Sequence, residues 1–235
     1  MLRMLPLCAL ALALLTNMLR AEEPSDVRLA IIGDSTVCEW PADSGQCGWG
    51  QFIHEYYDDG VTVTNLARSG RSTKTFIREG RWEKTLETQP DVILIQFGHN
   101  DSHAPDRPES TDSSTDYQEY LRQYVREARE QDAMPIFVTP MVRRQFHEDG
   151  TMRDNLRPYA EAMIAVGKEL EVPVIDLHQS SWKIVEELGP ERSPELANAP
   201  GDGTHFNEKG ARLMAELVMR ELSKIDSPLQ PYLTK

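Results

Sequence analysis

Three polar residues from the two ends of the chain have the side chains that serine-based acyl transfer requires. Ser35 follows an apolar run in the segment Gly33-Asp34-Ser35, where a turn can hold the hydroxyl out toward solvent. A serine hydroxyl is a poor nucleophile until a base takes its proton, and the imidazole of His205 can do so near neutral pH. Asp202 lies three residues before His205, so a tight turn can direct its carboxylate to the same ring. These residues predict a nucleophile, a general base and an orienting carboxylate.

Two further segments contain donors for the negative charge that acyl transfer places on a carbonyl oxygen. The Asn100 side-chain amide follows the third apolar run of the chain, and Gly70 follows the second. Fixed amide and backbone N–H donors stabilise such an oxyanion. The segments that carry Ser35 and His205 also have ordinary alternatives, because Gly-Asp-Ser is a common turn and Asp-x-x-His can cap a helix. Their occurrence together in one chain favours catalysis.

The apolar runs before these segments are expected to be strands of a mostly parallel sheet. They are nearly continuous in apolar residues, as is typical of strands buried on both faces. They alternate with amphipathic stretches in the manner of βα units, which predicts an α/β fold. Ligands of such sheets bind beyond the carboxyl ends of the strands, where three of the four polar segments lie. The expected strands cover residues 27–33, 61–67, 91–97, 134–139 and 172–176.

Helical periodicity is clearest near the C-terminus, where Leu213, Met214 and Leu217 fall on one face. Two polar, Pro-rich segments at 102–116 and 189–204 are expected to be loops. The expected helices cover residues 51–57, 117–131, 159–170, 182–188 and 207–224.

The length of 235 residues, 40% of them hydrophobic, suits one sizeable domain. Residues 1–21 have the layout of a secretory signal peptide, with Arg3 as a basic start and an apolar run too short to span a bilayer. This segment holds Arg3 and Arg20 and no acidic residue, so its removal changes the formal charge from −13 to −15. Such a charge repels nucleic acids and anionic membranes. We therefore expect a single domain over residues 22–235, secreted or periplasmic, with no nucleic-acid or membrane partner.

Two cysteines, Cys38 and Cys47, remain after the expected cleavage. In an oxidising compartment they can close a small disulfide loop after Ser35. Two unpaired thiols are the alternative.

The order and spacing of four segments resemble the sequence blocks of the SGNH (GDSL-type) hydrolase superfamily: Gly33-Asp34-Ser35, Gly70, Gly98-His99-Asn100-Asp101 and Asp202-Gly203-Thr204-His205. Other segments are similar to the rhamnogalacturonan acetylesterase branch, whose members remove acetyl groups from pectic polysaccharide: Gly48-Trp49-Gly50-Gln51, Asn65-Leu66-Ala67, Ser69-Gly70-Arg71-Ser72 and Arg143-Arg144.

The resemblance implies a role for each residue of the site. Ser35 would be the nucleophile, His205 the general base and then acid, and Asp202 the carboxylate that orients it. The backbone N–H groups of Ser35 and Gly70, with the Asn100 side chain, would form the oxyanion hole. The resemblance also implies a flavodoxin-like, three-layer α/β/α fold with a five-stranded parallel sheet, and neither a metal nor another cofactor.

A metal site is the competing interpretation of His99 and His103. Their side chains are of the type that zinc hydrolases use. However, the two residues lie four apart in a Pro-rich segment with no helix to align them. His99 is instead expected at the wall of the cleft, near the substrate.

Other side chains are candidates for contact with a sugar. Arg143 and Arg144 follow the fourth strand and can pair with uronate carboxylates, or else with Glu148 or Asp149 in solvent. Three tryptophans can stack on sugar rings or pack in the core, namely Trp40, Trp49 and Trp182.

The sequence therefore predicts a secreted, monomeric serine esterase that removes acetyl groups from a polysaccharide. A lipase or lysophospholipase on the same scaffold is the alternative, but the expected loops at 102–116 and 189–204 are polar and offer no groove for a long acyl chain. A non-catalytic carbohydrate-binding protein would not need a nucleophile, a base and an oxyanion donor together.

Overall fold

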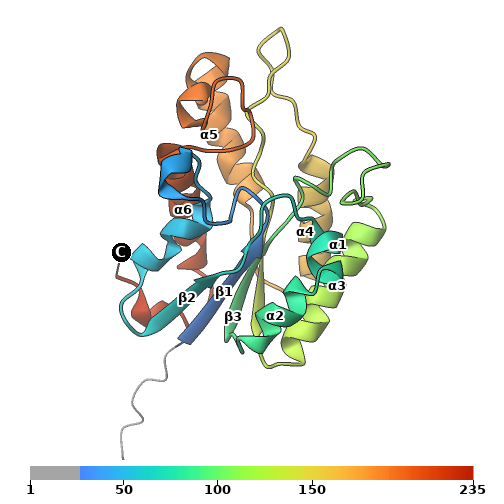
Figure 1. Cartoon of the computed structure of the whole chain (residues 1–235), viewed down its shortest axis with the longest axis vertical. Coiled ribbons are helices and arrows are strands. Elements are labelled where there is room, and N and C mark those ends of the chain that lie inside the picture. The colour runs from blue at the N-terminus through green and yellow to red at the C-terminus, as the bar shows by residue number, and fades with distance from the viewer. Residues whose placement is uncertain (1–26, 235) are drawn as a thin grey trace, which may run out of the picture.

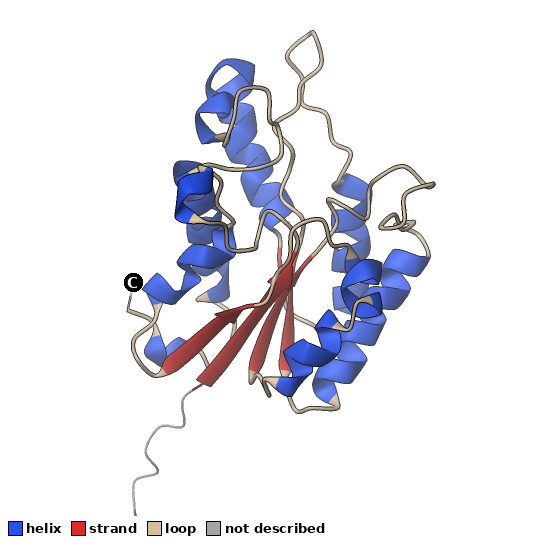
Figure 2. Ribbon diagram, in the orientation of Figure 1, coloured by secondary structure: helices blue, strands red, loops and turns tan. Residues whose placement is uncertain are grey.

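The computed structural model describes residues 27–234 as a parallel sheet between two layers of helices (Figures 1 and 2). The sheet order is β2-β1-β3-β4-β5, and every neighbouring pair is parallel. The expected three-layer α/β/α fold with a five-stranded parallel sheet is therefore confirmed. The predicted signal peptide, residues 1–21, lies outside the described residues. The strands are β1 (Val27–Gly33), β2 (Val61–Asn65), β3 (Val92–Gln96), β4 (Met134–Val138) and β5 (Val174–Ile175).

Alternate residues of β1, β3 and β4 enter different hydrophobic cores, which explains the continuous apolar runs. Leu29 and Ile31 of β1 pack in a core with α5 (Leu177–Arg192), α6 (Glu208–Leu222) and the 3-10 helix η2 (Trp49–Tyr56). Ala30 and Ile32 enter the core on the other face. Figure 1 shows that this second face is covered by α1 (Thr73–Arg78), α2 (Arg81–Glu87), α3 (Asp116–Arg129) and α4 (Arg157–Glu169).

Helix α6 is built as its sequence predicts. Its buried face includes Met214, Leu217 and Val218, and the side chain of Asn207 caps its first turn by accepting a hydrogen bond from the Gly210 N–H. The cap residue Asn207 lies two residues after His205 and sets where α6 begins. Thus α6 anchors one end of the segment that carries His205.

Several elements differ from the expectations, each for a local reason. The expected helix at 51–57 is the 3-10 helix η2, and the short helices α1 and α2 were not anticipated because six or seven residues show too little periodicity. The expected loop at 189–204 begins inside α5, which kinks at Gly189 (φ 63°) and continues from Pro190 to Arg192. The remaining 3-10 turns are η1 (Ala42–Ser44), η3 (Ser193–Leu196) and η4 (Gln230–Tyr232).

The chain changes direction across the sheet at β1. It runs from β1 to β2 on one side and then returns to β3 on the other, so the strand order reverses between β1 and β3. Sheets of this kind bind ligands beyond the carboxyl ends of the strands at such a point. None of the helices between residues 27 and 234 is long and apolar enough to cross a bilayer.

Candidate active site

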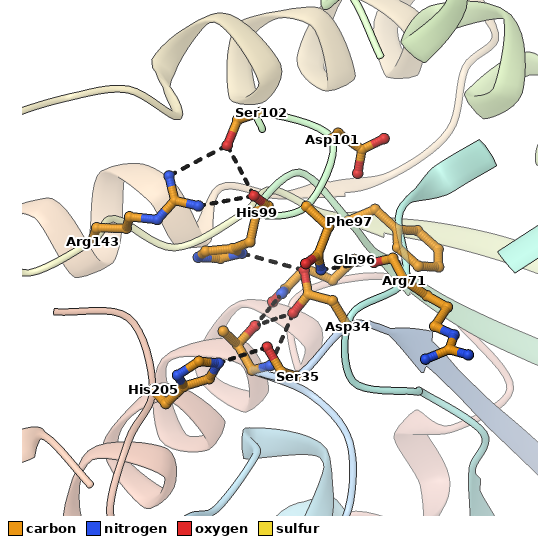
Figure 3. A network of polar contacts seen from close by, with 12 residues as sticks. Asp34, Ser35, Arg71, Gln96, Phe97, His99, Asp101, Ser102, Arg143 and His205 are labelled. Carbon is orange, nitrogen blue, oxygen red and sulfur yellow. Dashed lines mark hydrogen bonds and ion pairs between the residues drawn. The ribbon is translucent and has the colours of Figure 1, made fainter. Parts of the chain in front are cut away.

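Residues predicted from both ends of the chain meet beyond the carboxyl ends of β1 and β3 (Figure 3). Ser35 follows β1, Asn100 follows β3, and His205 precedes α6. The His205 ring and the Ser35 hydroxyl meet although 170 residues separate them in the sequence.

The turn that carries Ser35 packs tightly between β1 and β3. A Cβ at Gly33 would lie 2.6 Å from Val37 Cγ2 and 2.7 Å from the Gln96 carbonyl oxygen, so only glycine fits where the turn begins. The Ser35 carbonyl oxygen accepts a hydrogen bond of 3.0 Å from Trp40 Nε1, which fixes the other side of the turn. Ser35 is therefore held on a rigid scaffold, as a nucleophile requires.

Ser35, His205 and Asp202 form a continuous chain of polar contacts. His205 Nε2 lies 3.0 Å from Ser35 Oγ, and His205 Nδ1 lies 2.9 Å from Asp202 Oδ2. In the tautomer protonated at Nδ1, the ring donates to Asp202 and accepts from Ser35. Burial raises the pKa of Asp202, but hydrogen bonds from the His205 N–H, the His205 ring and the Thr204 N–H outweigh it and leave the pKa below its usual value. The carboxylate is therefore ionised when it faces the imidazole.

Arg144 supports the Asp202–His205 turn from behind. Its Nη2 donates to the carbonyl oxygens of Asp202 (3.1 Å) and His205 (2.6 Å). Its backbone N–H donates to the carbonyl oxygen of Gly203. The guanidinium lies 4.2 Å from the centre of the Phe206 ring. Arg144 is buried, and burial lowers its pKa to about 10 against the attraction of Asp202. This position does not fit the contact with a sugar carboxylate that the sequence suggested.

The predicted oxyanion donors lie in the segments that follow β2 and β3. Gly70 has φ 80°, a conformation that side chains disfavour, and it is exposed. Asn100 is mostly buried, and one hydrogen of its Nδ2 goes to the Arg71 carbonyl oxygen at 2.9 Å, which leaves the second hydrogen. Within residues 27–234, neither the Ser35 N–H nor the Gly70 N–H donates to another group. Donors with no protein acceptor are available to a ligand.

A buried polar network behind Ser35 was not anticipated from the sequence. Asp34 Oδ1 accepts hydrogen bonds from the N–H and the hydroxyl of Thr36, and Gln96 and Trp49 extend the chain of bonds into the core. His99 Nδ1 lies 3.3 Å from Asp34 Oδ2. Burial raises the pKa of Asp34, but His99 and the Thr36 bonds outweigh it and hold the pKa below its usual range. The only hint in the sequence was Gln96, a polar residue ending a buried strand.

A second buried carboxylate, Asp101, links the segments on either side of it through hydrogen bonds. It accepts hydrogen bonds from the N–H and the hydroxyl of Thr73, at the start of α1, and from the Thr111 hydroxyl in the segment after β3. Burial raises its pKa to about 7. Asp101 thus joins two segments that flank Asn100.

The histidines of the metal hypothesis have separate surroundings. His99 is buried against Asp34, whereas His103 Nδ1 lies 2.7 Å from Glu109 Oε1. Burial lowers the pKa of His99, with partial compensation by Asp34. In the described part of the chain, no group of three or more His, Cys, Asp or Glu residues is arranged to hold a metal ion.

Arg143 lies beside His99. It donates to the His99 carbonyl oxygen at 2.8 Å and to Ser102 Oγ at 3.3 Å (Figure 3). Burial lowers its pKa, and the nearby Asp34 opposes that effect. Of the two predicted arginines, only Arg143 is therefore partly open to a substrate.

The tryptophans also divide by position. Trp49 is buried in the core and donates to Gln96, and Trp182 is covered by Arg157, whose guanidinium carbon lies 5.3 Å from the ring centre. Trp40 is partly exposed next to Ser35. Only Trp40 is thus placed to meet a substrate at this site.

Of the two alternatives for Cys38 and Cys47, a disulfide or two unpaired thiols, the structure has two free thiols. Cys38 is buried under the nucleophile turn with its Sγ 3.9 Å from the Ser35 carbonyl oxygen, and burial raises its pKa to about 12. Cys47 forms an isolated β-bridge with Phe206. Main-chain pairing with the segment after His205, rather than a disulfide, holds this loop.

Comparisons with known proteins agree with the fold and show the family of the chain. The model of the GDSL-like Lipase/Acylhydrolase family matches residues 31–213. The chain is 39% identical over 222 residues to rhamnogalacturonan acetylesterase RhgT of Bacillus subtilis, covering 88% of this chain and 94% of that protein. The crystal structure of YxiM from Bacillus subtilis superposes with a TM-score of 0.74 at 29% identity over 85% of this chain and 56% of that one. The acetylxylan esterase Axe2 from Geobacillus stearothermophilus shares the fold, with a TM-score of 0.67 at 23% identity over 84% of this chain and 94% of that one.

Proposed function

Because the chain belongs to the GDSL-like lipase/acylhydrolase family, we propose that it removes O-acetyl groups from an extracellular or periplasmic polysaccharide, with pectic rhamnogalacturonan as the expected substrate. The chain is an enzyme of the carboxylic ester hydrolase class. One observation carries the proposal: the Ser35 hydroxyl lies 3.0 Å from the His205 ring, which lies 2.9 Å from the Asp202 carboxylate. The similarity to RhgT over most of both chains supports the choice of substrate.

Acylation begins when Ser35 Oγ attacks the acetyl carbonyl carbon and its proton passes to His205 Nε2. The carbonyl oxygen becomes an oxyanion that accepts hydrogen bonds from the N–H groups of Ser35 and Gly70 and from Asn100 Nδ2. Asp202 stabilises the imidazolium. His205 then gives the proton to the sugar oxygen as the C–O bond breaks, so the sugar leaves as an alcohol and the acetyl group stays on Ser35.

Deacylation repeats these steps with water. His205 takes a proton from the water as its oxygen attacks the acetyl carbon, and the same donors hold the second oxyanion. The bond to Ser35 Oγ breaks, His205 returns the proton to that oxygen, and acetate leaves. Across the two steps, the acetyl ester and one water are converted into the sugar alcohol and acetate, and Ser35 and His205 return to their starting states.

A lipase remains less well supported than an acetylesterase. A long acyl chain needs an extended apolar groove beside the nucleophile. The segment that follows Asn100 instead carries polar contacts, such as those of Glu109 with His103 and Arg107. An acetyl group is short enough to need no such groove.

The proposal is tested with Ser35→Ala, assayed on 4-nitrophenyl acetate and by acetate release from acetylated rhamnogalacturonan. We expect a loss of about 10⁴-fold or more in kcat on both, because the attacking oxygen is gone. Ser223→Ala is the matched control, since this serine ends α6 and is exposed. Full activity in a folded Ser35→Ala enzyme would exclude the mechanism. Hydrolysis of the small ester alone by the unsubstituted enzyme would keep the mechanism and reject the polymer substrate.

A further inference from the structure

A pocket of about 360 Å³ opens directly beside the nucleophile turn. Its walls are residues 38–41, in the segment after Ser35, and residues 67–69 with Arg71, in the segment after β2. The first wall begins three residues after Ser35, and the residues of the second wall flank Gly70 in the sequence, so an occupant of the pocket lies next to the segments that carry Ser35 and Gly70. Its volume lies in the range of pockets that hold small ligands, which run from about 300 to 1,000 Å³.

Trp40 supplies this pocket with a fixed aromatic surface. Its backbone N–H donates to Gln51 Oε1 at 3.2 Å, and its Nε1 donates to the Ser35 carbonyl oxygen at 3.0 Å. The ring is partly exposed and lines the pocket beside Pro41 and Ala67. An indole held at both ends loses little conformational entropy on binding. Its open face suits the apolar C–H face of a sugar ring.

Arg68 supplies the same pocket with an uncommitted cation. Its backbone N–H donates to the Gly33 carbonyl oxygen at 2.9 Å, which fixes the main chain, but its exposed guanidinium has no hydrogen-bond or ion-pair partner within residues 27–234. Arg71, in the same pocket, is committed to Glu79 and to the Ser69 carbonyl oxygen. A free guanidinium fork matches the geometry of a carboxylate.

Glu39 sets the orientation in which an acidic ligand fits the pocket. It is exposed in the same lining, and it repels a carboxylate while accepting hydrogen bonds from hydroxyl groups. A sugar that carries a carboxylate on one side therefore binds with that group toward Arg68 and its hydroxyls toward Glu39. The chain as a whole has a formal charge of −13, so a polyanionic substrate needs a local cation to offset the general repulsion.

We propose that this pocket is a subsite for a uronate ring next to the acetylated sugar, stacked on Trp40 and held through its carboxylate by Arg68. The proposal rests on the proposed function, which places a polysaccharide at Ser35. It adds a source of selectivity for acidic over neutral acetylated chains. Arg68 contributes to binding and takes no part in the acyl transfer, because within residues 27–234 its guanidinium has no hydrogen bond or ion pair with Ser35, His205 or Asp202.

The test is competition against hydrolysis of 4-nitrophenyl acetate by deacetylated rhamnogalacturonan oligosaccharides. For Arg68→Gln we expect the inhibition constant of the oligosaccharides to rise about tenfold or more, as for loss of a hydrogen bond to a charged group. Arg68→Lys should restore part of the affinity, and Glu39→Gln should lower the constant. The kcat/KM for 4-nitrophenyl acetate should stay unchanged in all three variants. The matched control is Arg78→Gln, which removes an exposed, unpaired arginine at the end of α1 and should change neither quantity.

Salt and a neutral substrate give a second comparison. Added salt should raise the inhibition constant of the unsubstituted enzyme more than that of Arg68→Gln, because it screens the ion pair. The KM for neutral acetylated xylo-oligosaccharides should be the same in both enzymes. An inhibition constant unaffected by Arg68→Gln, or an equal loss on every substrate, would overturn the proposal.

The two proposals fail in different experiments. Acetate release from acetylated rhamnogalacturonan by the unsubstituted enzyme decides the proposed substrate. Arg68-dependent competition by the acidic oligosaccharide decides the subsite. Competition that depends on Arg68 without acetate release would keep the subsite and reject that polymer as the substrate.

Discussion

Asp34 and Asp101 are both completely buried at the carboxyl end of the sheet, yet the protein sets their pKa values in opposite directions. Asp34 directly precedes Ser35 after β1, and Asp101 directly follows Asn100 after β3. The pKa of Asp34 is held below its usual value, whereas that of Asp101 rises to about 7. The same degree of burial thus accompanies a fixed charge beside the nucleophile and a titrating group beside the predicted oxyanion donor.

The neighbours of the two carboxylates account for the difference. Asp34 has His99 at 3.3 Å in addition to its hydrogen bonds from Thr36. Asp101 accepts hydrogen bonds only from Thr73 and Thr111 in the described part of the chain. Desolvation disfavours the charged form of both groups. The nearby histidine, in addition to hydrogen bonds, overcomes it at Asp34, whereas the hydrogen bonds from Thr73 and Thr111 alone do not overcome it at Asp101.

The largest effect, on catalysis, is expected at Asn100, the predicted oxyanion donor that directly precedes Asp101. Asn100→Ala removes one oxyanion donor, so kcat should fall about a hundredfold or more with little change in KM. The measurement is steady-state hydrolysis of 4-nitrophenyl acetate, with urea unfolding as the control for folding. A rate equal to that of the unsubstituted enzyme would show that Asn100 does not stabilise the oxyanion and that only the nucleophile side of the comparison matters for catalysis.

A smaller effect, on stability, is expected from neutralising Asp34. A group whose pKa is lowered in the folded state stabilises that state above its unfolded value of about 3.9, and the contribution is lost as the pH falls through the folded value. At pH 8, Asp34→Asn should therefore lower the free energy of unfolding by about 2 kcal/mol, the range for hydrogen bonds to a charged group. Urea unfolding at pH 8 measures this change. Equal stability at pH 8 would mean that the Asp34 charge is not favoured by its surroundings.

The sequence singled out candidate site residues because the rule behind them is topological. Apolar runs end where parallel strands end, and ligands bind at that edge. The positions of Ser35 and Asn100 after such runs, together with the resemblance of their segments to the SGNH hydrolase blocks, made them candidates. Asp34 and Asp101 sit in the same motifs but were not singled out, because a sequence does not reveal that a carboxylate is buried. Their opposite pKa shifts depend on contacts with residues distant in the chain, such as Asp101 with Thr73, 28 positions away.

Arg144 and the cysteines show the same limit. Two adjacent arginines after a strand look alike in a sequence, yet Arg143 is partly open while Arg144 is buried behind the Asp202–His205 turn. Side chains of neighbouring residues point in different directions, and only the packing decides which one meets solvent. Likewise, the spacing of Cys38 and Cys47 permitted a disulfide, but the pairing of Cys47 with Phe206 holds the loop instead.

The smallest effect is expected at Asp101, with the sign opposite to that at Asp34. Its pKa rises from 3.8 to about 7 on folding, so between these values the folded state holds a proton that the unfolded chain has lost. The free energy of unfolding therefore falls as the pH rises from about 4 to about 7, and the cost persists above pH 7. At about 1.4 kcal/mol for each pKa unit, this cost is at most about 4 kcal/mol.

Asp101→Asn keeps an oxygen acceptor for the Thr73 and Thr111 hydroxyls and never ionises, but its amide N–H groups meet the Thr73 N–H, which offsets part of the gain. We therefore expect the variant to be more stable than the unsubstituted enzyme by about 1 kcal/mol at pH 8, with no such gain at pH 4. Urea unfolding of both proteins across this pH range measures the difference, and Asp112→Asn, an exposed carboxylate in the segment after β3, is the control. If Asp101→Asn were destabilised by the same amount at both pH values, Asp101 would be ionised throughout, and its contrast with Asp34 would disappear.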